Sequence, residues 1–185
     1  FELVREEQCD LVLLAGDLFD GAYTPHTYQN LYDVLKAIAV PVFITPGNHD
    51  FCGSDSPWIK ELWPENVHIF KSNRIESVAL PALDCRVYGA GFESMDCPAL
   101  LQNFRADCEE KYAIGIFHGD PTQIGSPYNP ITKAQVLASN WIIWPWATST
   151  KRIVLWRAKP SARGPAAPWA AATTNRVKRA YILSN

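Results

Sequence analysis

Two short apolar runs, each followed at once by polar residues, constrain the fold of this chain more than any other feature. The run LVLLAG spans residues 11–16, and VPVFITPGN spans residues 40–48. Both have the composition of strands that are buried on both faces. Between them, residues 27–39 repeat apolar side chains at helical spacing. A strand, a helix and a second strand of these lengths predict a βαβ unit with two parallel strands.

The rest of the first 140 residues continues the alternation of strands and helices. A helix is expected over 131–139, with Thr132 near its start, and the further strand candidates are 66–70, 75–80, 85–90 and 112–118. The predicted fold class is therefore α/β: a mixed, mainly parallel sheet covered by helices. Two tryptophans and a phenylalanine at irregular spacing, Trp58, Trp63 and Phe70, are predicted to be structural rather than base-stacking residues.

The composition is that of a soluble globular protein. The chain has 185 residues, of which 48% are hydrophobic and 19% are charged, enough for one domain with a proper core. No stretch approaches the ~20 consecutive apolar residues of a membrane span, and no signal peptide is recognisable. The five cysteines are widely scattered, which predicts reduced thiols and a cytoplasmic location.

Three strand ends carry residues suited to metal chemistry. They are GDLFD at 16–20, GNHD at 47–50 and HGD at 118–120. Ligands of open α/β sheets bind outside the carboxyl ends of the strands. A lone Gly-Asp is usually a turn and a lone His is usually structural, but three such strand ends in order indicate a site. Carboxylate, amide and imidazole groups suit Mn²⁺, Fe²⁺ or Zn²⁺. The candidate residues are Asp17, Asp20, Asn48, His49, Asp50 and His118.

These motifs resemble the second, third and fourth motifs of the calcineurin-like metallophosphoesterases. The long form LVLLAGDLFDG followed by PVFITPGNHD is especially similar to the DNA-repair exonuclease branch, the SbcD-type nuclease subunits. The resemblance covers roughly residues 1–140. It implies a metal-dependent phosphoesterase in which two divalent ions, Mn²⁺ first and Fe²⁺ or Zn²⁺ as alternatives, assist in-line attack of water on a phosphoester.

The resemblance also assigns roles to the candidate residues. It implies that Asp17 bridges both ions, while Asn48 and His118 ligate the second ion. His49 would face the phosphate as leaving-group acid or charge stabiliser, with Asp50 orienting it and Asp20 in a supporting position. Two family motifs are missing from the chain: an Asp-x-His that would precede residue 1, and a Gly-His-x-His after the fourth motif. At most one ion and little activity are therefore expected of this chain.

Residues 140–185 differ sharply from residues 1–139, which form the predicted phosphoesterase domain. All nineteen acidic residues lie before residue 141, whereas the last 45 residues hold eight Lys or Arg and five of the seven tryptophans. Tryptophan has one codon, so part of this segment can be reverse-translated. A shifted frame through NWIIWPWATST is compatible with Leu-Asp-Tyr-Leu-Ala-Leu-Gly-His-Ile-His, which contains the missing motif. We therefore predict a frameshift near Asn140; the alternative is a genuine basic tail that binds nucleic acid.

Three functions remain open from the sequence. The first is a DNA-repair exonuclease, with DNA as substrate and an SMC-like ATPase as partner. The second is a nucleotide or small-molecule phosphodiesterase of the same superfamily. The third is a non-catalytic binding module that keeps the fold without its metals.

Overall fold

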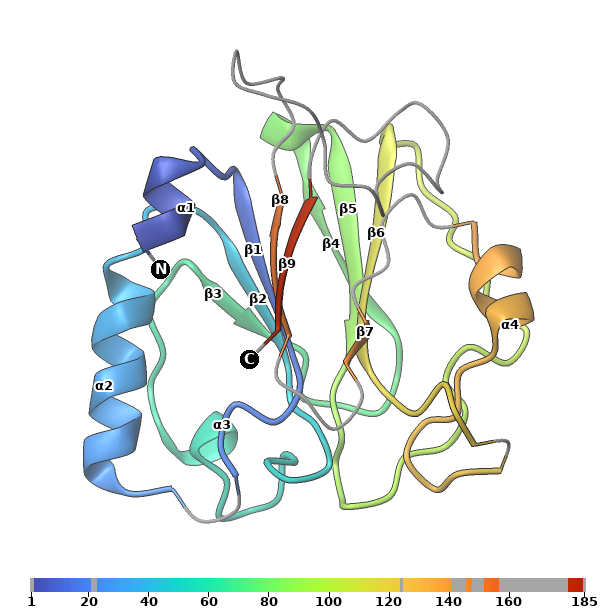
Figure 1. The fold of residues 1–185 in the computed structure, drawn as a ribbon, viewed down its shortest axis with the longest axis horizontal. Coiled ribbons are helices and arrows are strands. Elements are labelled where there is room, and N and C mark those ends of the chain that lie inside the picture. Colours follow the sequence, from blue (N-terminus) through green and yellow to red (C-terminus); the bar gives the residue numbers. More distant parts are fainter. Residues whose placement is uncertain are drawn as a thin grey trace.

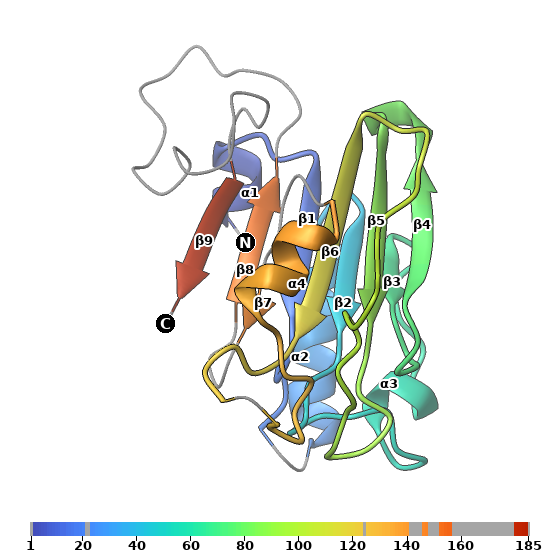
Figure 2. The ribbon, with the colours of Figure 1, turned by 90° about the vertical axis from the view of Figure 1, so that its right-hand side faces the viewer.

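The computed structural model describes residues 2–20, 23–123, 125–140, 146–147, 152–156 and 180–184. Its strands form two sheets that pack face to face (Figure 1, Figure 2). Sheet A has the order β3-β2-β1-β8-β9, and sheet B has the order β4-β5-β6-β7. The strands are β1 Leu11–Ala15, β2 Val42–Thr45, β3 Val67–Ile69, β4 Glu76–Leu80, β5 Cys85–Ala90, β6 Tyr112–His118, β7 Trp146–Ala147, β8 Arg152–Trp156 and β9 Ala180–Ser184.

Both sheets are mixed. In sheet A, β1 pairs with β2 and β2 with β3 in parallel, whereas β8 is antiparallel to both β1 and β9. In sheet B, β6 is parallel to β5 and β7, and β4 is antiparallel to β5. The predicted α/β class with mixed pairing is confirmed. The division into two sheets was not evident in the sequence, because periodicity shows that a strand is buried but not which sheet it joins.

Strand β1 shows why its whole sequence is apolar. Leu11, Leu13 and Ala15 lie in the cluster between the sheets, together with Val87 and Ile114 of sheet B. The alternate residues of β1 pack on the other face of sheet A, against the helices. All five residues of the strand are 0% exposed. A strand covered on both faces has no place for a polar side chain until it ends.

The described residues form four α-helices and one short 3-10 helix. They are α1 Glu2–Glu6, α2 Pro25–Lys36, α3 Pro57–Lys60, η1 Pro81–Leu83 and α4 Lys133–Ala138, counted over the described residues. Figure 1 shows α1 and α2 beside sheet A and α4 at the opposite side of the molecule. Helix α4 begins after Thr132, whose side chain accepts a hydrogen bond from the Gln135 amide, as a capping box does.

The aromatic residues predicted to be structural are indeed part of the core. Trp58 and Phe70 are 0% exposed, and Trp63 packs against the same cluster as Trp58. The indoles of Trp58 and Trp63 are stacked, with ring centroids 4.9 Å apart.

Strands β7, β8 and β9 come from the segment after residue 139. Most of that segment lies outside the described residues, so the domain boundary and the frameshift both stay predictions. No helix among the described residues is long and apolar enough to cross a membrane.

Candidate active site

The turn after β1 presents the first site residue. Gly16 and Asp17 both have left-handed backbone conformations, with φ of 71° and 53°. The Gly16 amide donates to the Thr45 carbonyl at 2.8 Å, which links the ends of β1 and β2. A Cβ atom on Gly16 would lie only 1.9 Å from Nδ1 of His118. Glycine is therefore required here by both the backbone and the imidazole that packs on it.

The carboxylate of Asp50 fastens the loop after β1 to the loop after β2. Its oxygens accept hydrogen bonds from four backbone amides, at 2.7–3.2 Å: those of Asp17, Leu18, Phe19 and Gly47. Burial raises the pKa of Asp50 to about 6, although the amides that donate to it oppose the rise. The sequence comparison implied that Asp50 orients His49. That role stays a prediction; the structure shows that four backbone amides donate to the carboxylate.

Three predicted metal ligands from three strand ends meet at one point. Nε2 of His118 lies 2.9 Å from Oδ1 of Asn48 and 3.5 Å from Oδ2 of Asp17. The other oxygen of Asp17 accepts from the His49 amide at 3.1 Å. His118 is the last residue of β6 in sheet B, whereas Asp17 and Asn48 follow β1 and β2 of sheet A. The two sheets end at the same edge of the molecule, and this brings the three side chains together.

The spacing and chemistry of this cluster fit one metal ion. Two ligand atoms that each lie about 2.1 Å from an ion are about 3.0–3.4 Å apart at octahedral or tetrahedral angles, close to the separations found around Nε2. Burial lowers the pKa of His118, which favours the neutral imidazole that a metal requires. Nδ1 of His118 is buried without a hydrogen-bond partner among the described residues. Within the same residues, no group of three or more His, Cys, Asp or Glu side chains forms a metal-binding cluster. The cluster therefore depends on the amide oxygen of Asn48.

The ring of His49 lies beside the carboxylate of Asp20. Its Nδ1 lies 3.4 Å from Oδ1 of Asp20, and both side chains are largely exposed, at 53% and 85%. Asp20, which the sequence placed only in a supporting position, is thus the carboxylate beside the imidazole. His49 is joined to the metal-ligand cluster through its backbone amide rather than through its ring.

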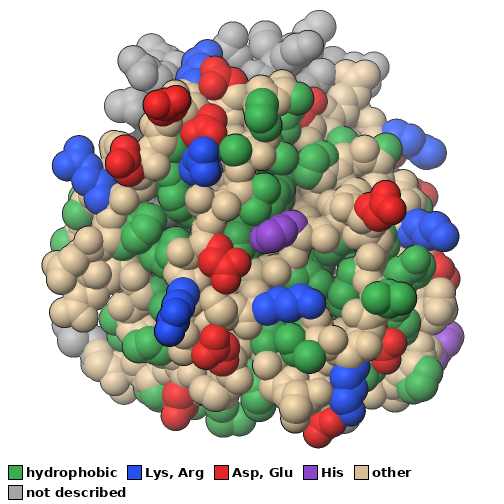
Figure 3. All heavy atoms as spheres, turned by 180° about the vertical axis from the view of Figure 1, so that it is seen from behind, with side chains coloured by type: hydrophobic (Ala, Val, Ile, Leu, Met, Phe, Trp, Pro, Cys, Tyr) green, Lys and Arg blue, Asp and Glu red, His purple; other side chains and the backbone are tan. Residues whose placement is uncertain are grey.

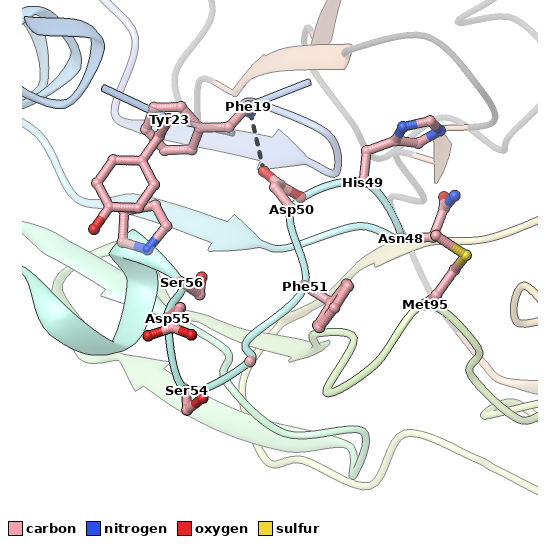
Figure 4. A pocket seen from close by; sticks show the side chains of 12 residues that line it. Phe19, Tyr23, Asn48, His49, Asp50, Phe51, Ser54, Asp55, Ser56 and Met95 are labelled. Atoms are coloured by element: carbon pink, nitrogen blue, oxygen red, sulfur yellow. Dashed lines mark hydrogen bonds between the residues drawn. The ribbon is translucent and has the colours of Figure 1, made fainter. Parts of the chain in front are cut away.

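A pocket of about 640 Å³ lies beside Asn48 and His49 (Figure 4). Its apolar lining consists of Phe19, Tyr23, Phe51, Pro57 and Met95, and its polar lining includes Asp50, Ser54, Asp55 and Ser56. Sequence reasoning did not single out the aromatic residues of this lining. The available signal was their position: Phe19 lies inside the GDLFD motif and Phe51 directly follows GNHD.

Comparison with known proteins agrees with this geometry. Residues 1–140 match the Calcineurin-like phosphoesterase family. An uncharacterized metallophosphoesterase of Bacillus subtilis (strain 168), YhaO, is 33% identical over 161 residues, covering 80% of this chain and 38% of that protein. A probable cyclic nucleotide phosphodiesterase of Coxiella burnetii is 35% identical over 68 residues, covering 35% of this chain and 27% of that protein.

A more distant relative is a probable glycerophosphodiester phosphodiesterase of Arcobacter nitrofigilis. It is 24% identical over 131 residues, covering 69% of this chain and 48% of that protein. The chain thus spans less than half the length of each of these relatives. Since the family match extends over residues 1–140, which include Asp17, Asn48 and His118, the chain belongs to the calcineurin-like phosphoesterase family of hydrolases.

Proposed function

We propose that the cluster of Asp17, Asn48 and His118 holds a divalent metal ion for the hydrolysis of a phosphodiester. The observation that carries the proposal is the separation of 2.9 Å and 3.5 Å between Nε2 of His118 and the two oxygen atoms, which suits a shared ion. The family generally uses two divalent metal ions. We propose Mn²⁺ as the ion, with Fe²⁺ and Zn²⁺ as alternatives, because the cluster has oxygen and imidazole ligands and no thiolate.

The surrounding residues would serve the same reaction. Bound divalent ions activate water and neutralise the charge of a phosphate. His49 lies at the pocket side of the cluster with a carboxylate beside its ring, so its ring would act as the leaving-group acid or as a charge stabiliser. Asp50 would keep Asp17 and Asn48 in register, since it holds the loops that carry them.

A small nucleotide diester is the substrate that we propose first. One relative is named a probable cyclic nucleotide phosphodiesterase, and another a probable glycerophosphodiester phosphodiesterase. Among the described residues that line the pocket there is no Lys or Arg, whereas a nucleic-acid strand is held mainly by such cations. Figure 3 shows a face on which Lys and Arg side chains of the described residues are interspersed with Asp and Glu, without a broad basic area.

DNA is the second candidate substrate. It is favoured by the long form LVLLAGDLFDG followed by PVFITPGNHD, which is similar to the SbcD-type exonuclease branch. An SMC-like ATPase partner belongs to this second candidate alone.

The metal site can be tested by titrating the purified chain with Mn²⁺ and following free Mn²⁺ by electron paramagnetic resonance. We expect Asp17→Asn and His118→Ala to weaken binding at least tenfold. Asp33→Asn, an exposed carboxylate on α2, is the matched control and should bind as the unmodified chain does. Mn²⁺ binding that is unchanged in both site variants would overturn the proposal. If neither the unmodified chain nor any variant binds Mn²⁺, the non-catalytic module is favoured.

The substrate can be tested with the chain in excess over labelled substrate, so that slow turnover is measurable. Mn²⁺-dependent cleavage of 3′,5′-cyclic AMP or bis(p-nitrophenyl) phosphate, without cleavage of blunt DNA ends, is the expected result. Release of nucleotides from DNA ends, sensitive to Asp17→Asn, would favour the exonuclease instead.

A further inference from the structure

We infer that the pocket beside the metal-ligand cluster binds the nucleobase of the substrate, an inference that rests on the proposed function. The pocket shares Asn48 and His49 with the site of phosphate chemistry. A substrate whose phosphate lies at the Asp17, Asn48 and His118 cluster can therefore extend one of its ester groups into the pocket. The volume of about 640 Å³ lies within the range of small-molecule sites, roughly 300–1,000 Å³.

The walls of the pocket suit a flat, apolar face. Figure 4 shows the rings of Phe19 and Tyr23 at one side of the pocket, and Phe51 and Met95 at the other. Phe19 is held in place by aromatic neighbours, with its ring centroid 5.1 Å from that of Trp58 and 5.9 Å from that of Tyr23. Met95 is 56% exposed, so its thioether is open to a ligand. Aromatic rings and thioethers pack favourably on the faces of bases.

The charges around the pocket favour a neutral group over a second phosphate. Of its two carboxylates, Asp50 is occupied by backbone amides. Asp55 forms an ion pair with Lys60, which does not line the pocket. A phosphate would meet these carboxylates without a lining Lys or Arg among the described residues, whereas the edge of a base can hydrogen-bond to the hydroxyls of Ser54 and Ser56. The lining thus combines apolar walls with a few polar groups, as a nucleobase requires.

The side chain of Met95 gives a direct way to observe the pocket, because it is the only methionine of the chain. We would label the methionine methyl group with ¹³C, assign its NMR signal with Met95→Leu, and titrate with adenosine, AMP and methyl phosphate in the presence of Zn²⁺, because a bound Mn²⁺ ion would broaden the signal. We expect adenosine and AMP to shift the signal through the ring current of the base, and methyl phosphate to leave it in place. AMP should bind at least tenfold more tightly than methyl phosphate.

The variants separate the pocket from the phosphate site. Phe51→Ala should weaken the binding of AMP about 5- to 100-fold, which is the effect of losing one stacked base. The affinity for methyl phosphate should change less than twofold. Met95→Ala, which truncates an exposed side chain, should likewise weaken the binding of AMP but not that of methyl phosphate. Leu62→Ala is the control, since Leu62 is 84% exposed and does not line the pocket. Equal affinities for AMP and methyl phosphate, or equal losses for both ligands in Phe51→Ala, would overturn the inference.

The same samples distinguish failure of the inference from failure of the proposed function. If Mn²⁺ binding does not depend on Asp17 and His118, the proposed function fails. Adenosine has no phosphate, so its binding then still tests the pocket by itself. If Mn²⁺ binds as proposed but adenosine does not shift the Met95 signal, the base pocket alone is refuted. A blunt DNA duplex, compared with one closed by hairpin loops at both ends, shows whether the bound base comes from a DNA end or from a free nucleotide.

Discussion

At the residue scale, the candidate site depends on an unusual backbone conformation. Asp17 is a non-glycine residue with φ of 53°, a conformation that costs free energy for an L-residue with a side chain. Its carboxylate is thereby placed between the His49 amide and the His118 imidazole. Strain of this kind persists where surrounding contacts enforce it. Here the contact is the hydrogen bond that the Asp17 amide donates to the Asp50 carboxylate.

Gly16→Ala is expected to destroy the site. The substitution adds a side chain at φ of 71° and places a Cβ atom 1.9 Å from the His118 ring. We expect a loss of at least tenfold in Mn²⁺ affinity, measured by paramagnetic resonance, and a loss of stability well above the roughly 1–2 kcal/mol cost of the left-handed conformation alone. Gly125→Ala is the control, because Gly125 has φ of 79° but nothing within 4 Å of its Cβ position. Equal effects of the two variants would show that the imidazole contact is unimportant.

His68 is expected to make the fold sensitive to acid. Burial lowers its pKa below the ordinary value of 6.5, and its ring centroid lies 4.7 Å from that of Phe70. The unfolded chain therefore binds this proton more readily, so the contribution of His68 to stability is complete above about pH 6.5 and is lost as the pH falls toward the lower folded pKa. Urea unfolding at pH 8.0 and 5.5 should show a smaller loss of stability for His68→Phe than for the unmodified chain. Equal losses would contradict this prediction.

At the element scale, the very short helix α3 joins the pocket to the core. The helix begins after Ser56, whose side chain accepts a hydrogen bond from the Trp58 amide at 3.3 Å. Ser56 and Pro57 line the pocket, and the next side chain, Trp58, is fully buried against the outer face of sheet A. One turn of helix thus contributes to the lining of the pocket on one side and to the core on the other.

Trp58→Ala should destabilise the whole domain. The indole is 0% exposed and packs against Phe19 and Trp63, and large-to-small changes of buried aromatic residues cost about 3–5 kcal/mol. The free energy of unfolding in urea measures this directly. Leu62→Ala, at a residue that is 84% exposed, should change it by no more than about 0.5 kcal/mol. A loss below about 1 kcal/mol for Trp58→Ala would mean that α3 is not anchored as described.

At the scale of the whole molecule, the site exists because two sheets end at one edge. Asp17 and Asn48 follow parallel strands of sheet A, so their proximity follows from the βαβ unit. His118 ends β6 of sheet B and is 70 residues from Asn48 along the chain, yet its Nε2 lies 2.9 Å from Oδ1 of Asn48. Unfolding of either sheet would therefore abolish the metal-ligand cluster.

The chain is expected to bind a single ion and to hydrolyse phosphodiesters near the background rate. The described residues offer one cluster of three ligands, whereas two-metal catalysis needs a second ion to clamp the phosphate with the first. Isothermal titration with Mn²⁺ should give a stoichiometry of at most one. Two bound ions, or multiple-turnover hydrolysis of bis(p-nitrophenyl) phosphate that lies well above the background rate, depends on Mn²⁺ and is abolished by Asp17→Ala, would contradict this prediction.

The sequence by itself determined the elements and the chemical character of the site. Strands β5 and β6 have the predicted bounds, and β1 and β2 lie within theirs. In β1, burial on both faces leaves an unbroken apolar run that polar residues end. The same reasoning placed Asp17, Asn48 and His118 at strand ends. Such local patterns can be recognised in the sequence because strand position and burial leave their signature within a few neighbouring residues.

Only the tertiary structure decided which side chains face one another. It paired His49 with Asp20 rather than with Asp50, whose carboxylate four backbone amides surround. It also divided the strands between two sheets and placed Phe19, Phe51 and Met95 around one pocket. These outcomes depend on distances between residues far apart in the chain, and such distances are set by the packing of whole sheets and loops, which no local pattern encodes.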